Sequence, residues 1–216
     1  LLLQPLRREY ILFAWYDIYY WRSKKGVLKM TKVYIVHGYQ ADSTKHWFPW
    51  LKQSLELEGH EVEILNLPDS SHPKVDVWLD YMNQNVTEVN SDTIFVTHSL
   101  GAITTLKFLN DLDVNHIGSL AIVSGFKDGI SDMPELEPFV QQDVDFENLQ
   151  NKILHRFGIA AKNDTVVPYE ATKRLCEALD AKFYLQEEGG HFCEQDGYDS
   201  FLFLKKKILT NFDLSL

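Results

Sequence analysis

Ser99 lies at the junction between an apolar run and a stretch typical of a helix. The β-branched run 93–97 leads through T-H-S-L-G, residues 97–101, into a segment rich in Ala, Ile and Leu. This pattern is typical of a nucleophile elbow, in which a tight turn lifts a serine hydroxyl above the ends of the strands. The following N–H, at Leu100, would lie at a helix N-terminus and could stabilise an oxyanion. The pattern predicts a nucleophilic serine.

The elbow differs from the common G-x-S-x-G pattern at its first position. Thr97 replaces the first glycine and adds side-chain atoms where strand and helix must approach closely. The simpler alternative is a serine that N-caps an ordinary helix. The choice between the two depends on whether partners for the serine lie elsewhere in the chain.

An acid and a histidine follow Ser99 in the order that such a nucleophile requires. Asp164 lies in the loop after the apolar run 154–160, and His191 follows the glycine pair 189–190. The order Ser, Asp, His is that of α/β-hydrolases. The alternatives are that Asp164 only begins a turn and that His191 only faces solvent. Together the three residues predict a catalytic triad.

A second oxyanion donor is expected after the first strand. The run Val33–Val36 ends in His37-Gly38, and the next backbone N–H groups are those of Tyr39 and Gln40. Tyr39 is the preferred donor, with Gln40 as its alternative. Gly38 would allow a backbone turn closed to other residues. We expect His37 to fix the loop by hydrogen bonds rather than to act as a catalyst.

Other reactive side chains fit structural roles better. Cys193 lacks a strand–turn–helix setting, Cys176 has the spacing of helix packing, and His98 is expected to pack the elbow. The eight histidines show no metal-ligand spacing, and no glycine pattern for a nucleotide is present. We therefore expect no metal and no cofactor.

Strand-like and helix-like segments alternate from Met30 onward, which predicts an α/β fold with a mostly parallel sheet covered by helices on both faces. In the segment 47–57, Trp47, Trp50, Leu51 and Leu55 are expected on one side of a helix, with Leu57 as a further candidate for that side. The expected strands are 33–36, 62–65, 93–97, 120–123, 154–160 and 182–185, and the expected helices are 47–57, 75–89, 100–109, 168–179 and 198–212. Pro168 suits the first helical position.

The segment 126–151 breaks this alternation. It contains two prolines and seven acidic residues, and we expect short helices and loops there. If it overhangs Ser99, its charge would repel anionic substrates.

Seven segments of the chain together resemble the YdeN and retinoblastoma-binding-protein-nine family of small serine hydrolases. They are V-Y-I-V-H-G-Y, H-W-F-P-W-L-K, L-N-L-P, T-H-S-L-G, V-S-G-F, N-D-T-V-V-P and G-G-H-F, between about residue 32 and the C-terminus. The resemblance implies a compact α/β-hydrolase fold without a large cap domain. It implies a triad of Ser99, Asp164 and His191, with Leu100 and Tyr39 as oxyanion donors, and activity on esters.

The expected reaction is two-step acyl transfer through an acyl-enzyme. Amide, thioester or lactone hydrolysis would use the same residues, and a catalytically weak interaction module would retain the fold without the activity. The candidate residues for the substrate pocket are His37, Gly38, Gln40, Trp47, Phe126, Val166 and Phe192. The expected partner is a small acyl substrate, and we favour a monomer.

The net charge of −10 argues against nucleic acid as a partner, because such binding needs Lys and Arg to neutralise phosphates. Two cysteines cannot form a disulfide framework, which favours the cytoplasm. For the domain from residue 30 to 216 we expect no membrane association.

Residues 1–29 differ from the rest, with a net charge of +4 and seven aromatic residues between Tyr10 and Trp21. The aromatic run is too short for a membrane span, although an interfacial anchor stays open. Our preferred hypothesis is that Met30 is the start of a bacterial protein, and that 1–29 is translated upstream sequence outside the domain.

Overall fold

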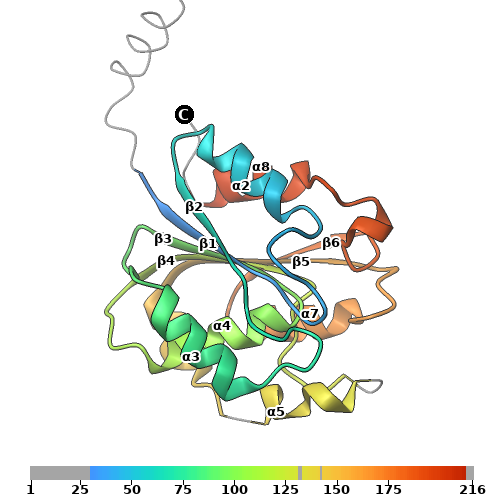
Figure 1. Cartoon of the computed structure of the whole chain (residues 1–216), viewed down its shortest axis with the longest axis horizontal. Helices are drawn as coiled ribbons and strands as arrows, with labels where there is room; N and C mark the ends of the chain where they lie inside the picture. The colour runs from blue at the N-terminus through green and yellow to red at the C-terminus, as the bar shows by residue number, and fades with distance from the viewer. Residues whose placement is uncertain (1–29, 131–132, 142, 213–216) are drawn as a thin grey trace, which may run out of the picture. The chain divides into compact units, whose positions relative to one another are not determined.

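Six parallel strands form one sheet at the centre of the protein (Figure 1). The computed structural model describes residues 30–130, 133–141 and 143–212. The strand order is β2-β1-β3-β4-β5-β6, and β1 pairs with β3 so that Val36 lies opposite Thr97. The strands are β1 (Lys32–Val36), β2 (Glu61–Leu65), β3 (Thr93–His98), β4 (Ile117–Val123), β5 (Ile153–Ala161) and β6 (Lys182–Gln186). The predicted α/β fold class is confirmed.

Helices cover both faces of this sheet (Figure 1). One face carries α2 (Phe48–Glu56) and α8 (Leu202–Asn211), and the other carries α3 (Val75–Asn85), α4 (Leu100–Asp111) and α7 (Tyr169–Ala178). Successive side chains of a strand point to opposite faces, so a sheet covered on both sides needs continuous apolar strands. In β1, Tyr34 and Val36 enter one core cluster, and Val33 and Ile35 enter the other.

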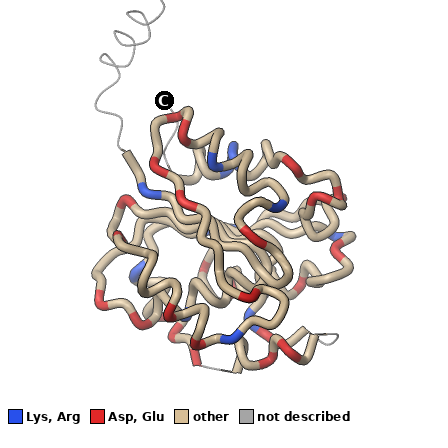
Figure 2. The backbone as a smooth tube through the Cα atoms, in the orientation of Figure 1, with Lys and Arg blue, Asp and Glu red and all other residues tan. Residues whose placement is uncertain are grey.

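Acidic side chains lie mainly outside the sheet. Figure 2 shows Asp and Glu positions along the helices and loops that surround the strands, with fewer Lys and Arg positions among them. This distribution leaves the central strands free of charge along most of their length, which suits their burial on both faces.

Several segment boundaries differ from those predicted. The α3 helix ends at Asn85, because Val86 leaves the helical conformation. Pro168 is the N-cap of α7 rather than its first helical residue. The predicted helix 198–212 begins at Leu202, after a 3₁₀ turn, η2 (Glu194–Asp196). On α2 the buried residues are Phe48, Leu51 and Leu55, whereas Leu57 follows the helix and is 75% exposed. The prediction that Leu57 faces the core was wrong.

The long connection from β4 to β5 forms short helices, as expected. They are η1 (Pro134–Leu136), α5 (Glu137–Val140) and α6 (Phe146–Lys152). Phe139 is buried and meets Trp78 of α3 edge-on at 5.3 Å between ring centroids. The segment is therefore held by apolar packing on the face of the sheet that also carries α3 and α4.

The hypotheses about residues 1–29 lie outside the described residues and stay predictions. Within residues 30–130, 133–141 and 143–212, no helix is both long and apolar enough to cross a bilayer. The same residues contain no group of three or more His, Cys, Asp or Glu placed to hold a metal ion.

Two leucines of one helical region provide a matched test of the packing. We predict that Leu51→Ala lowers the free energy of unfolding by about 2–5 kcal/mol, because it leaves a cavity in the core. Leu57→Ala should change it by less than about 0.5 kcal/mol, because that side chain is already in solvent. Urea denaturation of both variants measures the difference. Equal effects would contradict the placement of α2.

Candidate active site

Ser99 occupies a strained turn between β3 and α4. Its backbone has φ 52° and ψ −124°, a region that non-glycine residues rarely adopt. The turn is held because the Ser99 N–H donates to the Val123 carbonyl at 2.9 Å, and the Ala102 N–H donates to the Ser99 carbonyl at 3.0 Å. Ser99 stands at the N-cap position, yet its side chain makes no capping hydrogen bond. The alternative of an ordinary N-cap serine is therefore wrong.

Two glycines allow the turn to approach β1. A Cβ atom on Gly38 would lie 2.9 Å from the Cβ of Ser99, and one on Gly101 would lie 2.5 Å from the carbonyl oxygen of His37. Real Cβ atoms essentially never come this close to other heavy atoms, so both positions exclude larger residues. The elbow is thus pressed against the end of β1.

Thr97 fits this crowded position because its hydroxyl has a partner. The side chain is fully buried, and Oγ1 donates to the carbonyl of Ala121 on β4 at 3.1 Å. The residue that departs from the common elbow pattern therefore cross-links two central strands.

Asp164 is held by four donors. Its Oδ1 accepts the N–H groups of Val166 and Val167, each at 2.9 Å. Its Oδ2 accepts the Ser124 hydroxyl at 2.8 Å and faces Nδ1 of His191 at 2.9 Å. The side chain has no exposed surface. Asp164 therefore both begins a turn, as one alternative had it, and binds the histidine.

His191 is fixed at every polar atom except one. Its N–H donates to Oδ2 of Asp196 at 3.0 Å, and its carbonyl accepts from Nε2 of His98 at 2.8 Å. Its Nδ1 faces Asp164. Within the described part of the chain, Nε2 has no recorded hydrogen bond, so it is the ring atom that is free to exchange a proton with a neighbour. The alternative of a solvent-facing His191 is wrong, because the residue is only 9% exposed.

His98 joins the elbow to the histidine loop. Its ring centroid lies 4.8 Å from that of His191. Complete burial places the pKa of His98 well below the usual value for histidine, so the ring is neutral and its Nε2–H is the donor to the His191 carbonyl. The residue before Ser99 thus holds the loop that carries His191.

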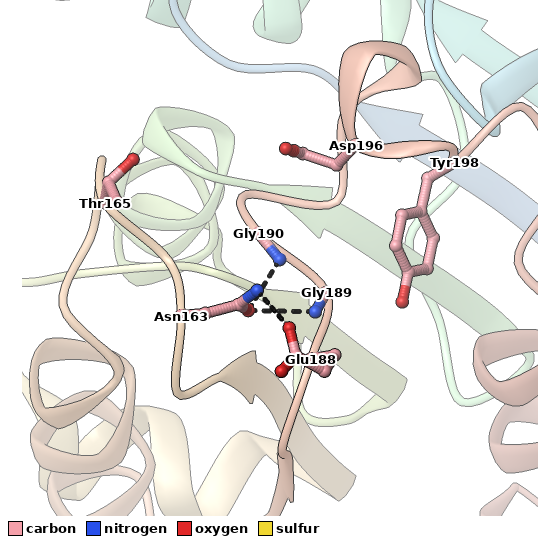
Figure 3. A pocket seen from close by; sticks show the side chains of 7 residues that line it. All are labelled: Asn163, Thr165, Glu188, Gly189, Gly190, Asp196 and Tyr198. Carbon is pink, nitrogen blue, oxygen red and sulfur yellow. Dashed lines mark hydrogen bonds between the residues drawn. The ribbon is translucent and has the colours of Figure 1, made fainter.

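Asn163, which precedes Asp164, also binds the loop that carries His191. Oδ1 of Asn163 accepts the N–H groups of Gly189 and Gly190, each at 2.9 Å, and Nδ2 donates to Glu188 (Figure 3). A polar pocket of about 400 Å³ opens here. It is lined by Asn163, Thr165, Glu188, Gly189, Gly190, Asp196 and Tyr198, none of which was a predicted pocket residue.

One of the two predicted oxyanion donors in the loop after β1 is already engaged in a hydrogen bond. The Gln40 N–H donates to the Ser70 carbonyl at 2.9 Å, which commits it. His37 fixes the loop, because its Nε2 accepts the Leu67 N–H at 2.9 Å and its Nδ1 lies 2.9 Å from the Gly38 carbonyl. Burial lowers the pKa of His37, so the ring stays neutral and can accept. These contacts favour Tyr39 over Gln40 as the donor.

Several predicted pocket residues are core residues instead. Trp47, Phe126 and Phe192 are at most 1% exposed and belong to the two core clusters. Phe192 stacks on Phe201 at 4.9 Å, and Trp47 contacts the same ring at 6.0 Å. Trp47 thus has the core role that its helical spacing indicates, and the burial of Phe126 and Phe192 is evidence against their prediction as pocket residues. His37 and Gly38 are likewise buried, whereas Gln40 is exposed and Val166 half-buried.

Comparison with known proteins assigns the chain to a family. A family model described as serine hydrolase matches residues 33–208, which include the elbow, Asp164 and His191. The chain belongs to the serine hydrolase family. Among its relatives is YdeN of Bacillus subtilis (strain 168), 39% identical over 173 residues that cover 79% of this chain and 91% of YdeN.

A more distant serine hydrolase has a similar length. The serine hydrolase RBBP9 of Rattus norvegicus is 25% identical over 186 residues, which cover 83% of this chain and 96% of that protein. A crystal structure of the ydeN gene product from B. subtilis superposes with a TM-score of 0.83 at 36% identity, covering 85% of this chain and all of that one. The predicted family is therefore confirmed.

Ser124, Asn163 and Asp196 were not among the predicted site residues of this serine hydrolase. Ser124 follows β4 with φ 46°, and its fully buried hydroxyl reaches Asp164 from a neighbouring strand end. The sequence marked it only as a serine directly after an apolar strand, within the segment V-S-G-F of the family resemblance, and neither feature assigns it a role. Such a serine also suits an ordinary turn, and for that reason it does not stand out.

The two cysteines are free, buried thiols. Burial raises the pKa of Cys176 and of Cys193 to about 12. A thiol reacts as its thiolate, so neither residue is suited to act as the nucleophile at neutral pH.

Restoring the common pattern at residue 97 should harm the protein. We predict that Thr97→Gly lowers the free energy of unfolding by about 1–3 kcal/mol, because a buried hydrogen bond is lost and glycine weakens a strand. Thr97→Ser keeps the donor and should lose less. Denaturant unfolding of the two variants measures this, and a Thr97→Gly protein as stable as the natural one would contradict it.

Proposed function

We propose that the protein hydrolyses small carboxylic esters, with Ser99 as nucleophile, His191 as general base and Asp164 as the group that orients His191. The observation that carries the proposal is the state of His191. Its N–H, carbonyl and Nδ1 are all engaged by named side chains, and among the described residues nothing engages Nε2, which is left for proton transfer. The side chain that binds the His191 carbonyl is His98, the residue directly before Ser99 in the chain.

The reaction proceeds in two steps. Nε2 of His191 takes the Ser99 proton while Oγ attacks the carbonyl carbon of the ester. The N–H groups of Leu100 and Tyr39 hold the negative oxygen of the tetrahedral intermediate, which collapses as the alcohol leaves with the proton from His191. Water then gives a proton to His191 and attacks the acyl-enzyme. The second tetrahedral intermediate collapses to release the acid, and His191 returns the proton to Oγ of Ser99.

Asp164 stabilises the imidazolium that forms in each step. Its carboxylate accepts the Nδ1–H and so selects the tautomer in which Nε2 is the base. The other three donors keep the carboxylate aligned. The strained backbone at Ser99 also supports the enzyme over an interaction module, because a binding scaffold has no use for a serine held in this turn at such cost.

We assign this activity to residues 30–216, supported by the family match over 33–208. The cytoplasm stays the proposed location, supported by the two free cysteines. Repulsion of anionic substrates by the acidic segment 126–151 stays a hypothesis, and a monomer stays the favoured state.

Replacement of the nucleophile tests the proposal directly. We predict that Ser99→Ala abolishes turnover of short-chain p-nitrophenyl esters and labelling by a fluorophosphonate probe, while the melting temperature stays near that of the natural protein. Cys176→Ala is the matched control and should keep both turnover and labelling, because its buried, protonated thiol lies on α7 away from His191. Labelling retained in Ser99→Ala would refute the assignment.

Removal of the Ser124 hydroxyl tests the support of Asp164. We predict that Ser124→Ala lowers kcat/KM for the same esters by about 10-fold or more, because a hydrogen bond to a charged group is lost. Ser119→Ala, within β4 itself, removes a buried hydroxyl remote from Asp164 and should leave kcat/KM within about 2-fold. A matched loss in both variants would show that Ser124 acts only through stability.

The acidic segment is tested by a pair of substrates. We predict that a neutral aryl ester is hydrolysed faster than its carboxylate-bearing analogue, and that the gap narrows at high salt because exposed charges are screened. Faster turnover of the anionic ester would count against the hypothesis.

A further inference from the structure

We propose that His46 is a positioning residue that latches the loop carrying Tyr39 to the loop carrying His191, and that protonation of His46 opens the latch. The inference rests on the proposed function, in which Tyr39 supplies an oxyanion donor and His191 is the base. His46 lies at the end of the first loop, one residue before the N-cap of α2. It is not itself a catalytic residue.

Two reciprocal hydrogen bonds form the latch. The Glu194 N–H donates to Nδ1 of His46 at 3.2 Å, and the His46 N–H donates to Oε2 of Glu194 at 3.4 Å. Lys45 adds an ion pair with the other carboxylate oxygen of Glu194 at 3.6 Å. Residues 148 positions apart in the chain thus join the two loops at a single point.

The rings extend this connection to the elbow. The His46 centroid lies 5.6 Å from that of His98 and 5.3 Å from that of Phe48, both edge-on. His98 in turn lies 4.8 Å from His191 and binds its carbonyl. A displacement of His46 would therefore disturb His98 and, through it, the hydrogen bond that positions His191.

The first loop is anchored on its far side as well. The Gln40 N–H binds the Ser70 carbonyl, and the Ser43 N–H binds Oδ1 of Asn66 at 3.1 Å. Both partners belong to the connection between β2 and α3. The loop with Tyr39 is thus attached at two points. Gln40 and Ser43 bind it to the β2–α3 connection, and His46 binds it to the histidine loop through Glu194.

The latch requires neutral His46, because only an unprotonated Nδ1 can accept the Glu194 N–H. Burial lowers the pKa of His46 below its usual value, and Lys45 and His191 act in the same direction, while Glu194 and Asp196 oppose it. The facing ring of His98 is neutral. The latch is therefore closed at neutral pH and opens as the pH falls below the pKa of His46.

The backbone at His46 suggests a matched pair of variants. Its φ of 56° lies in the left-handed region, which glycine and asparagine tolerate best. His46→Asn keeps a side-chain acceptor close to the position of Nδ1 but cannot titrate. His46→Gly keeps the backbone but has no acceptor. Both remove the ring, so the difference between them isolates the hydrogen bond.

Kinetics of a neutral aryl ester provide the first measurement. At pH 8 we expect His46→Asn to keep kcat/KM within about 3-fold of the natural protein, and His46→Gly to lose about 10-fold, in kcat rather than KM. In the natural protein the slope of log kcat/KM against pH on the acid side should exceed 1, because both His46 and His191 must be neutral. In His46→Asn it should fall to the slope of one proton.

Amide hydrogen exchange provides the second measurement and does not depend on activity. His46→Gly should speed exchange in residues 38–47 and 189–197, whereas His46→Asn should not. Equal kinetics and equal exchange in the two variants would overturn the latch, as would an acid-side slope that His46→Asn leaves unchanged. If the natural protein neither turns over esters nor labels at Ser99, the proposed function is overturned. The latch would still stand if His46→Gly exchanges faster than the natural protein in these two segments.

Discussion

The parallel direction of all six strands is the constraint on which the site depends. Because every strand ends at the same edge of the sheet, the turns after β1, β3, β4, β5 and β6 all open onto one region. The residues of the site come from these five turns, which are far apart in the sequence. The apolar strands thus supply both the stability and the geometry, since their burial on both faces fixes their order and register.

Much of this arrangement could be predicted from the sequence because its signals are local. Apolar runs marked the strands, and the order Ser99, Asp164, His191 placed three side chains at strand ends. The direction in which a side chain points across a loop is not a local property. Phe192 was a candidate for the pocket, but the backbone turns its side chain into the core.

Burial gives the histidines around the site a common state. His37, His46 and His98 all have a pKa below the usual value, with desolvation as the main cause, so all three are neutral at neutral pH. A neutral ring donates at one nitrogen and accepts at the other, and His37 shows this in bridging two loops. Around the proposed base, these three imidazoles therefore act as hydrogen-bond donors and acceptors rather than as cations.

The adjacency of Asn163 and Asp164 has a consequence for how the fold can be altered. One short turn binds the backbone of the glycine pair through Asn163 and the ring of His191 through Asp164. These hydrogen bonds make the conformation of each loop depend on the other. The turns after β5 and β6 would therefore have to be replaced together. Chimaeras between members of the family would preserve the site only by transplanting both segments together.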